Sequence, residues 1–144
     1  MSTIPILHLD EDPLVTWVVS QHLQEAGIDV VSVNDPREFT SRLSQERFRI
    51  VLFDLQMKSD DGMGLLKSIK QRDAGVQVIL LSTLSSGHDL LVAKSNGAEA
   101  CVPKPLNDPQ QLIDAVKIAL ERENQWSCLL AELTSPRETA YTIN

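Results

Sequence analysis

The chain has 144 residues, 42% of them hydrophobic and 23% charged, which suits one compact domain rather than a disordered or membrane protein. Its formal net charge of −7 argues against direct nucleic-acid binding, because an acidic surface repels polyanions. No apolar run approaches the roughly 20 residues that span a bilayer, and no secretion signal opens the chain, so we expect a cytoplasmic protein. Cys101 and Cys128 lack metal-type spacing, which favours reduced thiols.

Five apolar runs of strand length alternate with five stretches of helical periodicity. In chain order, the predicted strands lie at residues 4–9, 30–33, 50–53, 76–81 and 100–102. The helical stretches that follow them are marked by apolar residues within 14–26, 39–43, 65–69, 90–93 and 112–120. Asp-Pro pairs open the first, second and last helices as a cap followed by proline at the first helical position. Gly27 and Gly97 follow the first and fourth helices, as expected at helix ends.

The predicted strands are apolar nearly throughout rather than alternating. Such strands are typical of a parallel sheet that is buried on both faces. A regular β–α alternation with right-handed crossovers then predicts an α/β protein with a doubly wound sheet. Ligands of such sheets bind beyond the carboxyl ends of the strands, so the residues at those ends are the candidates for a functional site.

Acidic, hydroxyl and basic side chains occupy the predicted strand ends. The first strand ends in Asp10-Glu11-Asp12, the third in Asp54 and the fourth in Ser82-Thr83, while the fifth leads to Lys104. Clustered carboxylates repel one another by about 4 kcal/mol at 4 Å, which a fold tolerates when a cation lies between them. Ligands that are all oxygen favour Mg²⁺, with Mn²⁺ as the alternative. Singly, each residue also suits an ordinary role, such as a helix cap at Asp12 or a solvent-exposed lysine.

Five short motifs occur in one order, each at a predicted strand end. They are Leu9-Asp10-Glu11-Asp12-Pro13, Asp54-Leu55-Gln56-Met57 with Asp61-Gly62, Leu81-Ser82, Gly97-Ala98 and Lys104-Pro105. In this order they resemble the receiver domain of two-component response regulators, over residues 4–122. The resemblance implies a flavodoxin-like sheet of five parallel strands in the order 2-1-3-4-5, with five helices.

The resemblance also implies a role for each matched residue. Asp54 would accept a phosphoryl group from a histidine kinase or a phosphotransfer protein. Asp10, Glu11 and Asp54 would hold Mg²⁺, together with the backbone carbonyl of Gln56. Ser82 would donate a hydrogen bond to one phosphoryl oxygen, and Lys104 would pair with another. Such a protein is a signalling switch rather than a turnover enzyme, apart from catalysing its own phosphorylation and dephosphorylation.

Four positions depart from the commonest pattern of this family. Glu11 replaces the usual second aspartate, and Lys58 stands where a proline usually follows Met57. Thr83 replaces Ala or Gly, which narrows access to the phosphoryl site. Cys101 replaces the Tyr or Phe that normally swings inward, which puts the usual switch in doubt.

Two other functions stay open beside the phosphoacceptor. One is a receiver-shaped interaction module that is never phosphorylated, which Lys58 and Cys101 slightly favour. The other is a phosphotransfer or hydrolytic enzyme of the aspartyl-phosphate type, but such enzymes usually carry a second acid where this chain has Gln56.

Residues 123–144 follow the predicted domain as a helical extension or a truncated linker. Trp126, Leu130 and Leu133 continue the three- and four-residue spacing of the last helix, although Glu123 interrupts it. This spacing is the seam that paired helices bury, and it predicts a homodimer through the last helix. A linker that frays in solution is the alternative.

Overall fold

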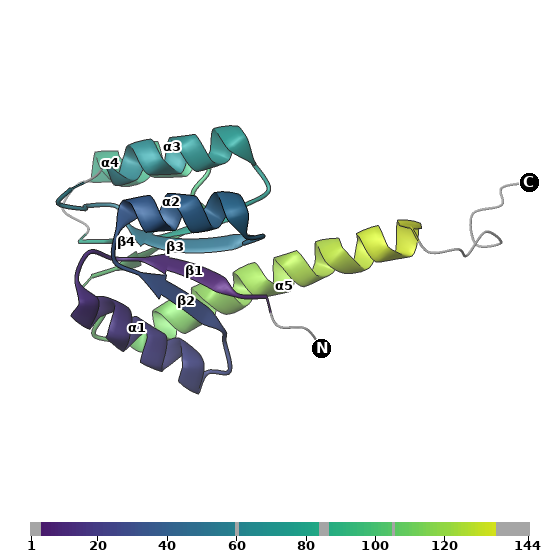
Figure 1. Cartoon of the computed structure of the whole chain (residues 1–144), viewed down its shortest axis with the longest axis horizontal. Helices are drawn as coiled ribbons and strands as arrows, with labels where there is room; N and C mark the ends of the chain where they lie inside the picture. Colours follow the sequence, from purple (N-terminus) through teal and green to yellow (C-terminus); the bar gives the residue numbers. More distant parts are fainter. Residues whose placement is uncertain (1–3, 60, 84–86, 105, 135–144) are drawn as a thin grey trace, which may run out of the picture.

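A computed structural model describes residues 4–59, 61–83, 87–104 and 106–134 of the chain (Figure 1). Five strands form one parallel sheet in the order β2-β1-β3-β4-β5. In chain order they are β1 (Ile6–Leu9), β2 (Val30–Val33), β3 (Ile50–Asp54), β4 (Gln77–Ser82) and β5 (Ala100–Pro103). The predicted fold class and strand order are confirmed.

Within the described ranges, five helices cover the two faces of this sheet (Figure 1). They are α1 (Pro13–Glu25), α2 (Pro36–Gln45), α3 (Gly62–Arg72), α4 (Gly87–Ser95) and α5 (Pro109–Thr134). Helices α2, α3 and α4 lie on one face, and α1 and α5 lie on the other. Two cores result, one on each face, as two-sided burial of the strands requires.

Alternation along each strand divides its side chains between the two cores. On β1, Leu7 and Leu9 join the core under α2, α3 and α4, whereas Ile6 joins the core under α1 and α5. β3 and β4 are almost entirely buried for the same reason. The sheet therefore forms a rigid platform, and its carboxyl edge carries the polar residues predicted at the strand ends.

Helix starts that adjoin the carboxyl edge are fixed by capping aspartates. The side chain of Asp12 accepts the amide of Leu14, and that of Asp35 accepts the amide of Arg37, each at 2.9 Å. Gly62 opens α3 so close to the Leu55 carbonyl that any side chain there would collide with backbone. This close approach sets the path of the loop between β3 and α3.

Helix α5 is the longest element and runs 26 residues, to Thr134. Its first half packs on the sheet through Leu112, Val116 and Ala119, whereas its second half projects away from the domain (Figure 1). The helix thus continues past residue 122 as the spacing predicted, and residues 135–144 of the predicted extension lie outside the described part. None of the helices in the described ranges combines the length with the apolar character that spanning a membrane requires.

Candidate functional site

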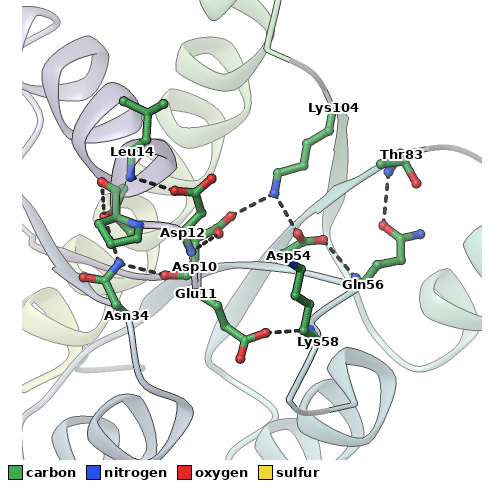
Figure 2. Close-up of polar contacts among 12 residues, drawn as sticks. Asp10, Glu11, Asp12, Leu14, Asn34, Asp54, Gln56, Lys58, Thr83 and Lys104 are labelled. Carbon is green, nitrogen blue, oxygen red and sulfur yellow. Dashed lines mark hydrogen bonds and ion pairs between the residues drawn. The ribbon is translucent and has the colours of Figure 1, made fainter.

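Three charged side chains from three strand ends meet at the carboxyl edge of the sheet (Figure 2). Asp10 follows β1, Asp54 ends β3 and Lys104 follows β5. The Nζ atom of Lys104 donates a hydrogen bond of 2.8 Å to Asp10 Oδ2 and another of 2.7 Å to Asp54 Oδ2. The structure thus brings together three of the residues that their places at strand ends predicted to converge.

The bridging ammonium lies in a nearly enclosed position. The exposed fractions of the side chains are 16% for Lys104, 6% for Asp10 and 13% for Asp54. Burial alone would lower the pKa of Lys104, but the hydrogen bonds and charges of Asp10 and Asp54 outweigh it and raise that pKa. Lys104 is therefore charged at neutral pH and offsets the mutual repulsion of the two carboxylates.

The first acidic residue is held by its own turn and by the end of β2. Asp10 Oδ1 accepts the amide of Asp12 at 2.9 Å, while Asp12 caps α1. The side-chain amide of Asn34 donates to the Asp10 carbonyl at 2.8 Å and to Thr16 Oγ1 at 3.0 Å. Asn34 was not predicted as a site residue, although a polar side chain directly after β2 is a signal of the same kind as the others.

Gln56 connects the candidate phosphoacceptor to the end of β4. Its backbone amide donates to Asp54 Oδ1 at 2.9 Å. Its side-chain Nε2 donates to Ser82 Oγ at 3.0 Å. Its Oε1 accepts the amide of Thr83 at 3.1 Å (Figure 2). The sequence assigned only the backbone carbonyl of Gln56 a role. No pattern in the chain signals that this exposed side chain grips β4.

Glu11 does not point at Asp10 and Asp54. Its Oε1 accepts the amides of Lys58 at 2.5 Å and Ser59 at 3.1 Å, and its Oε2 accepts the hydroxyl of Ser59. Figure 2 shows the carboxylate directed at the loop after β3 instead of the Lys104 bridge. Within the described ranges, no three His, Cys, Asp or Glu side chains are gathered around one metal position.

The donors at the carboxyl edge nevertheless suit a hard divalent cation. Asp10 and Asp54 are close enough to share one ammonium, so two carboxylates already face a common point. Mg²⁺ is usually held by one or two carboxylates, with further oxygens from carbonyl groups and water. The residues present therefore fit Mg²⁺, and Glu11 can join them only by leaving the loop.

A buried histidine lies directly behind the site. His8 is fully buried on β1, and neither ring nitrogen has a hydrogen-bond partner among the residues that the structure describes. Burial lowers the pKa of His8 to about 4; Asp10 acts in the opposite direction and Lys104 in the same direction. The imidazole is thus neutral at neutral pH and packed in the interior of the sheet.

Comparison with known proteins gives one consistent family. A family model described as the response regulator receiver domain matches residues 6–117. The chain is 32% identical over 117 residues to a CpxR homologue of Haemophilus influenzae, a transcriptional regulatory protein, covering 81% of this chain and 50% of that protein. It is 30% identical over 116 residues to the C4-dicarboxylate transport transcriptional regulatory protein DctD of Pseudomonas aeruginosa, covering 81% and 25%. The chain thus spans half or less of these relatives.

Solved structures agree on the fold. The response regulator DrrB of Thermotoga maritima is 30% identical with a TM-score of 0.74, over 85% of this chain and 54% of that one. A CheY-like receiver domain protein of Methanospirillum hungatei superposes with a TM-score of 0.78 over 86% of this chain and 98% of that one. At 24% identity the second likeness shows the fold alone.

Proposed function

The chain belongs to the response regulator receiver domain family, and from that premise we propose that it is a phosphoryl-accepting switch whose acceptor is Asp54. The observation that carries the proposal is the Lys104 bridge between Asp10 and Asp54 at the carboxyl edge. A nearly enclosed cation between two carboxylates is an unfavourable arrangement for stability alone. It suits a site whose charges are rearranged when a dianionic phosphoryl group arrives.

The contacts of Asp54 favour its action as a nucleophile. Its two oxygens are oriented separately, one by the amide of Gln56 and the other by Lys104. In the transfer, an Asp54 oxygen bonds to phosphorus as the phosphorus–nitrogen bond of a phosphohistidine breaks, and the imidazole leaves. Lys104 then pairs with one phosphoryl oxygen, and the Ser82 hydroxyl donates to another. Positioning and charge neutralisation are the main requirements of such a transfer.

Mg²⁺ is the cofactor of this proposal, with Mn²⁺ as the alternative. Asp10, Asp54 and the Gln56 carbonyl would hold the ion, with Glu11 once it is released. When bound, it supplies positive charge that neutralises the phosphoryl oxygens. The oxygen-only donor set supports this choice over zinc.

The proposed phosphoryl donor is a histidine kinase or a phosphotransfer protein. Two large apolar side chains, Leu14 and Trp17, are exposed by 66% and 61% on α1. They stand just after the loop that carries Asp10 and Glu11, so they offer an apolar contact beside the acceptor. The net charge of −7 leads us to assign no nucleic-acid binding to this chain. A cytoplasmic location is part of the proposal, and the free thiols of Cys101 and Cys128 suit it.

The output surface is proposed to include the second half of α5. Cys101 is exposed on β5 where the family usually has an aromatic ring, so the usual inward swing has no side chain to perform it. Trp126, Leu130 and Leu133 are exposed by 57–68% and continue the face of α5 that packs on the sheet. Burying aliphatic side chains of this size contributes about 1.5–3 kcal/mol each. We therefore propose that two copies pair through this segment.

Sedimentation of the full chain against a chain ending at Glu123 tests the pairing. We expect the full chain to sediment as a concentration-dependent dimer and the shortened chain as a monomer. Monomers of both at high concentration would rule out the homodimer and leave residues 124–134 as a linker or a site for another partner.

Intact-mass measurement tests the phosphoacceptor. Incubation with acetyl phosphate and Mg²⁺ should add one phosphoryl group, and EDTA or the Asp54→Asn substitution should abolish the addition. Labelling that survives the substitution would contradict the assignment to Asp54, and labelling that survives EDTA would contradict the metal requirement. A chain that is never labelled would support the alternative of a receiver-like interaction module that works without phosphorylation.

A further inference from the structure

Glu11 forms a clamp on the loop between β3 and α3, which we call the Glu11 clamp. The carboxylate accepts two consecutive backbone amides, from Lys58 and Ser59, and also the Ser59 hydroxyl. The hydroxyl of Ser59, the amides of Ser59 and Lys58 and the charge of Lys58 lower the pKa of Glu11, whereas desolvation opposes them. The ionised form of Glu11 is therefore the form that holds the loop at neutral pH.

Two departures from the family pattern meet in this clamp. A glutamate side chain is one methylene longer than the usual aspartate. With this extra length the Glu11 carboxylate contacts Lys58 and Ser59, which lie in the loop after β3. The family's usual proline at position 58 has no amide hydrogen, whereas Lys58 donates one to Glu11. The two departures therefore supply the acceptor, Glu11, and the donor, Lys58, of one hydrogen bond.

We propose that the Glu11 clamp couples metal occupancy to the β3–α3 loop, so that metal binding opens the clamp and the clamp weakens metal binding. The inference rests on the proposed function, because it takes Mg²⁺ to bind beside Asp54. One carboxylate cannot serve the loop amides and the ion in the same conformation. Part of the free energy of metal binding is then used to break the hydrogen bonds of Glu11 to residues 58 and 59. By linkage, a chain in which these bonds are absent binds the metal more tightly.

The loop that Glu11 holds is connected both to the start of α3 and to the end of β4. Gln56 pairs with Asp61 across this loop, and Asp61 accepts the amide of Met63 at the start of α3 at 3.1 Å. The same Gln56 grips Ser82 and Thr83 at the end of β4. Metal binding should therefore alter the contacts at the start of α3 and at the end of β4 before any phosphoryl group is transferred.

Solvent exchange of the Lys58 and Ser59 amides, measured by NMR on the full chain, reports the clamp directly. Without metal, both amides should exchange at least about tenfold faster in Glu11→Ala than in the parent chain, since each loses a hydrogen bond to a charged group. Saturating MgCl₂ should accelerate exchange of the same two amides in the parent chain. Shifts elsewhere at the carboxyl edge with unchanged exchange at residues 58 and 59 would overturn the clamp and leave the metal site intact. No spectral response to tens of millimolar MgCl₂ would overturn both the metal site and the coupling.

A double-mutant cycle on Mg²⁺ affinity gives the second test. Glu11→Asp keeps the charge but shortens the reach, and Lys58→Pro removes the donor while restoring the family's usual residue. Each should tighten Mg²⁺ binding, measured by calorimetry, by about fivefold. The double variant should gain much less than the product of the two, because both changes remove the same bond. Fully multiplicative effects, or weaker binding in both variants, would overturn the proposal.

Discussion

The two ends of the sheet each carry one basic side chain between two carboxylates. At the carboxyl edge, Lys104 lies 2.8 Å from Asp10 and 2.7 Å from Asp54. At the opposite end, Arg49 lies 2.7 Å from Asp73 and 3.5 Å from Glu123 of α5. The pairs differ in burial, because the side chains of the Lys104 bridge are 6–16% exposed and those of the Arg49 bridge are 15–50% exposed.

This difference separates the proposed phosphoryl-accepting site from an ion pair that we interpret as structural. The Arg49 bridge holds the α3–β4 loop and α5 against β3 in water, where such pairs contribute about 0–1 kcal/mol. Gln77 adds a hydrogen bond of 2.8 Å to the carbonyl of Ala119 at the same point, where α5 begins to leave the domain. The Lys104 bridge instead holds two like charges where the side chains have little exposure to solvent. Similar chemistry thus has different energetic consequences because water reaches the two bridges differently.

The largest expected effect on stability comes from His8, which is buried in the core beside the carboxyl edge. His8 has its pKa lowered to about 4 in the folded chain, against 6.5 for an ordinary histidine. The unfolded chain therefore binds more protons between these values, so the free energy of unfolding falls as the pH drops through 6.5 towards 4. This contribution is about 3 kcal/mol in total. Urea unfolding of the parent chain and His8→Leu should show the extra acid loss only in the parent, and equal pH slopes would contradict it.

The second effect is the stability of the Lys104 bridge. Lys104→Met leaves Asp10 and Asp54 facing each other without their cation, which should lower the free energy of unfolding at neutral pH by about 2 kcal/mol. Asp54→Asn placed in the same chain should restore part of that loss, because it removes one of the repelling charges. Urea titration at pH 7 measures both variants. A double variant as unstable as Lys104→Met would contradict the repulsion argument.

The third effect is smaller, because the Arg49 bridge is exposed. Arg49→Met should lower the free energy of unfolding by about 1 kcal/mol or less, and high salt should reduce the difference. The hydrogen bond from Arg49 also holds the pKa of Asp73 below its ordinary value. The contribution of the bridge should therefore be present above that ordinary pKa and be lost as the pH falls through the lowered one. A loss as large as that of Lys104→Met would remove the distinction between the two ends.

The smallest expected effect concerns the side-chain hydrogen bonds of Gln56 at the carboxyl edge. Gln56→Met keeps the size of the side chain but removes its hydrogen bonds to Ser82 and Thr83. Exchange of the Thr83 amide should accelerate about fivefold, the equivalent of one net hydrogen bond, while overall stability changes by less than about 1 kcal/mol. Amide exchange measured by NMR, with Gln56→Glu as the control that keeps an acceptor, tests this. Unchanged exchange in Gln56→Met would mean that the side chain does not hold β4.

Much of the fold followed from local patterns in the sequence. Apolar strands, Asp-Pro caps and regular alternation predicted the parallel sheet, and the meeting of Asp10, Asp54 and Lys104 followed from their places at strand ends. The predicted strand boundaries differ by two residues at the start of β1, by one at the end of β3 and of β5, and by one at each end of β4. The apolar pattern reports burial, whereas a strand is bounded by backbone pairing: Val76 is buried but pairing with β3 begins at Gln77.

The side-chain contacts across loops could not be predicted in the same way. Glu11 was assigned to the metal from the resemblance, but its carboxylate contacts Lys58 and Ser59, since its extra methylene allows a choice between partners. The grip of Gln56 on Ser82 and Thr83 depends on the rotamer of an exposed side chain, which has no periodic signature. The backbone of the sheet sets the positions of the strand-end residues, whereas these contacts depend on the length and the rotamer of each side chain.

Phosphoryl incorporation into Lys104→Met and Arg49→Met, measured side by side, tests most directly the claim that only the carboxyl-edge bridge is functional. Each folded variant would be incubated with acetyl phosphate and Mg²⁺, and the rate of mass gain would be compared with that of the parent chain. We expect a rate about tenfold lower in Lys104→Met, because a cation that stabilises the transferring group is lost, and an unchanged rate in Arg49→Met. Equal rates in the two variants, or a slow rate confined to Arg49→Met, would contradict it.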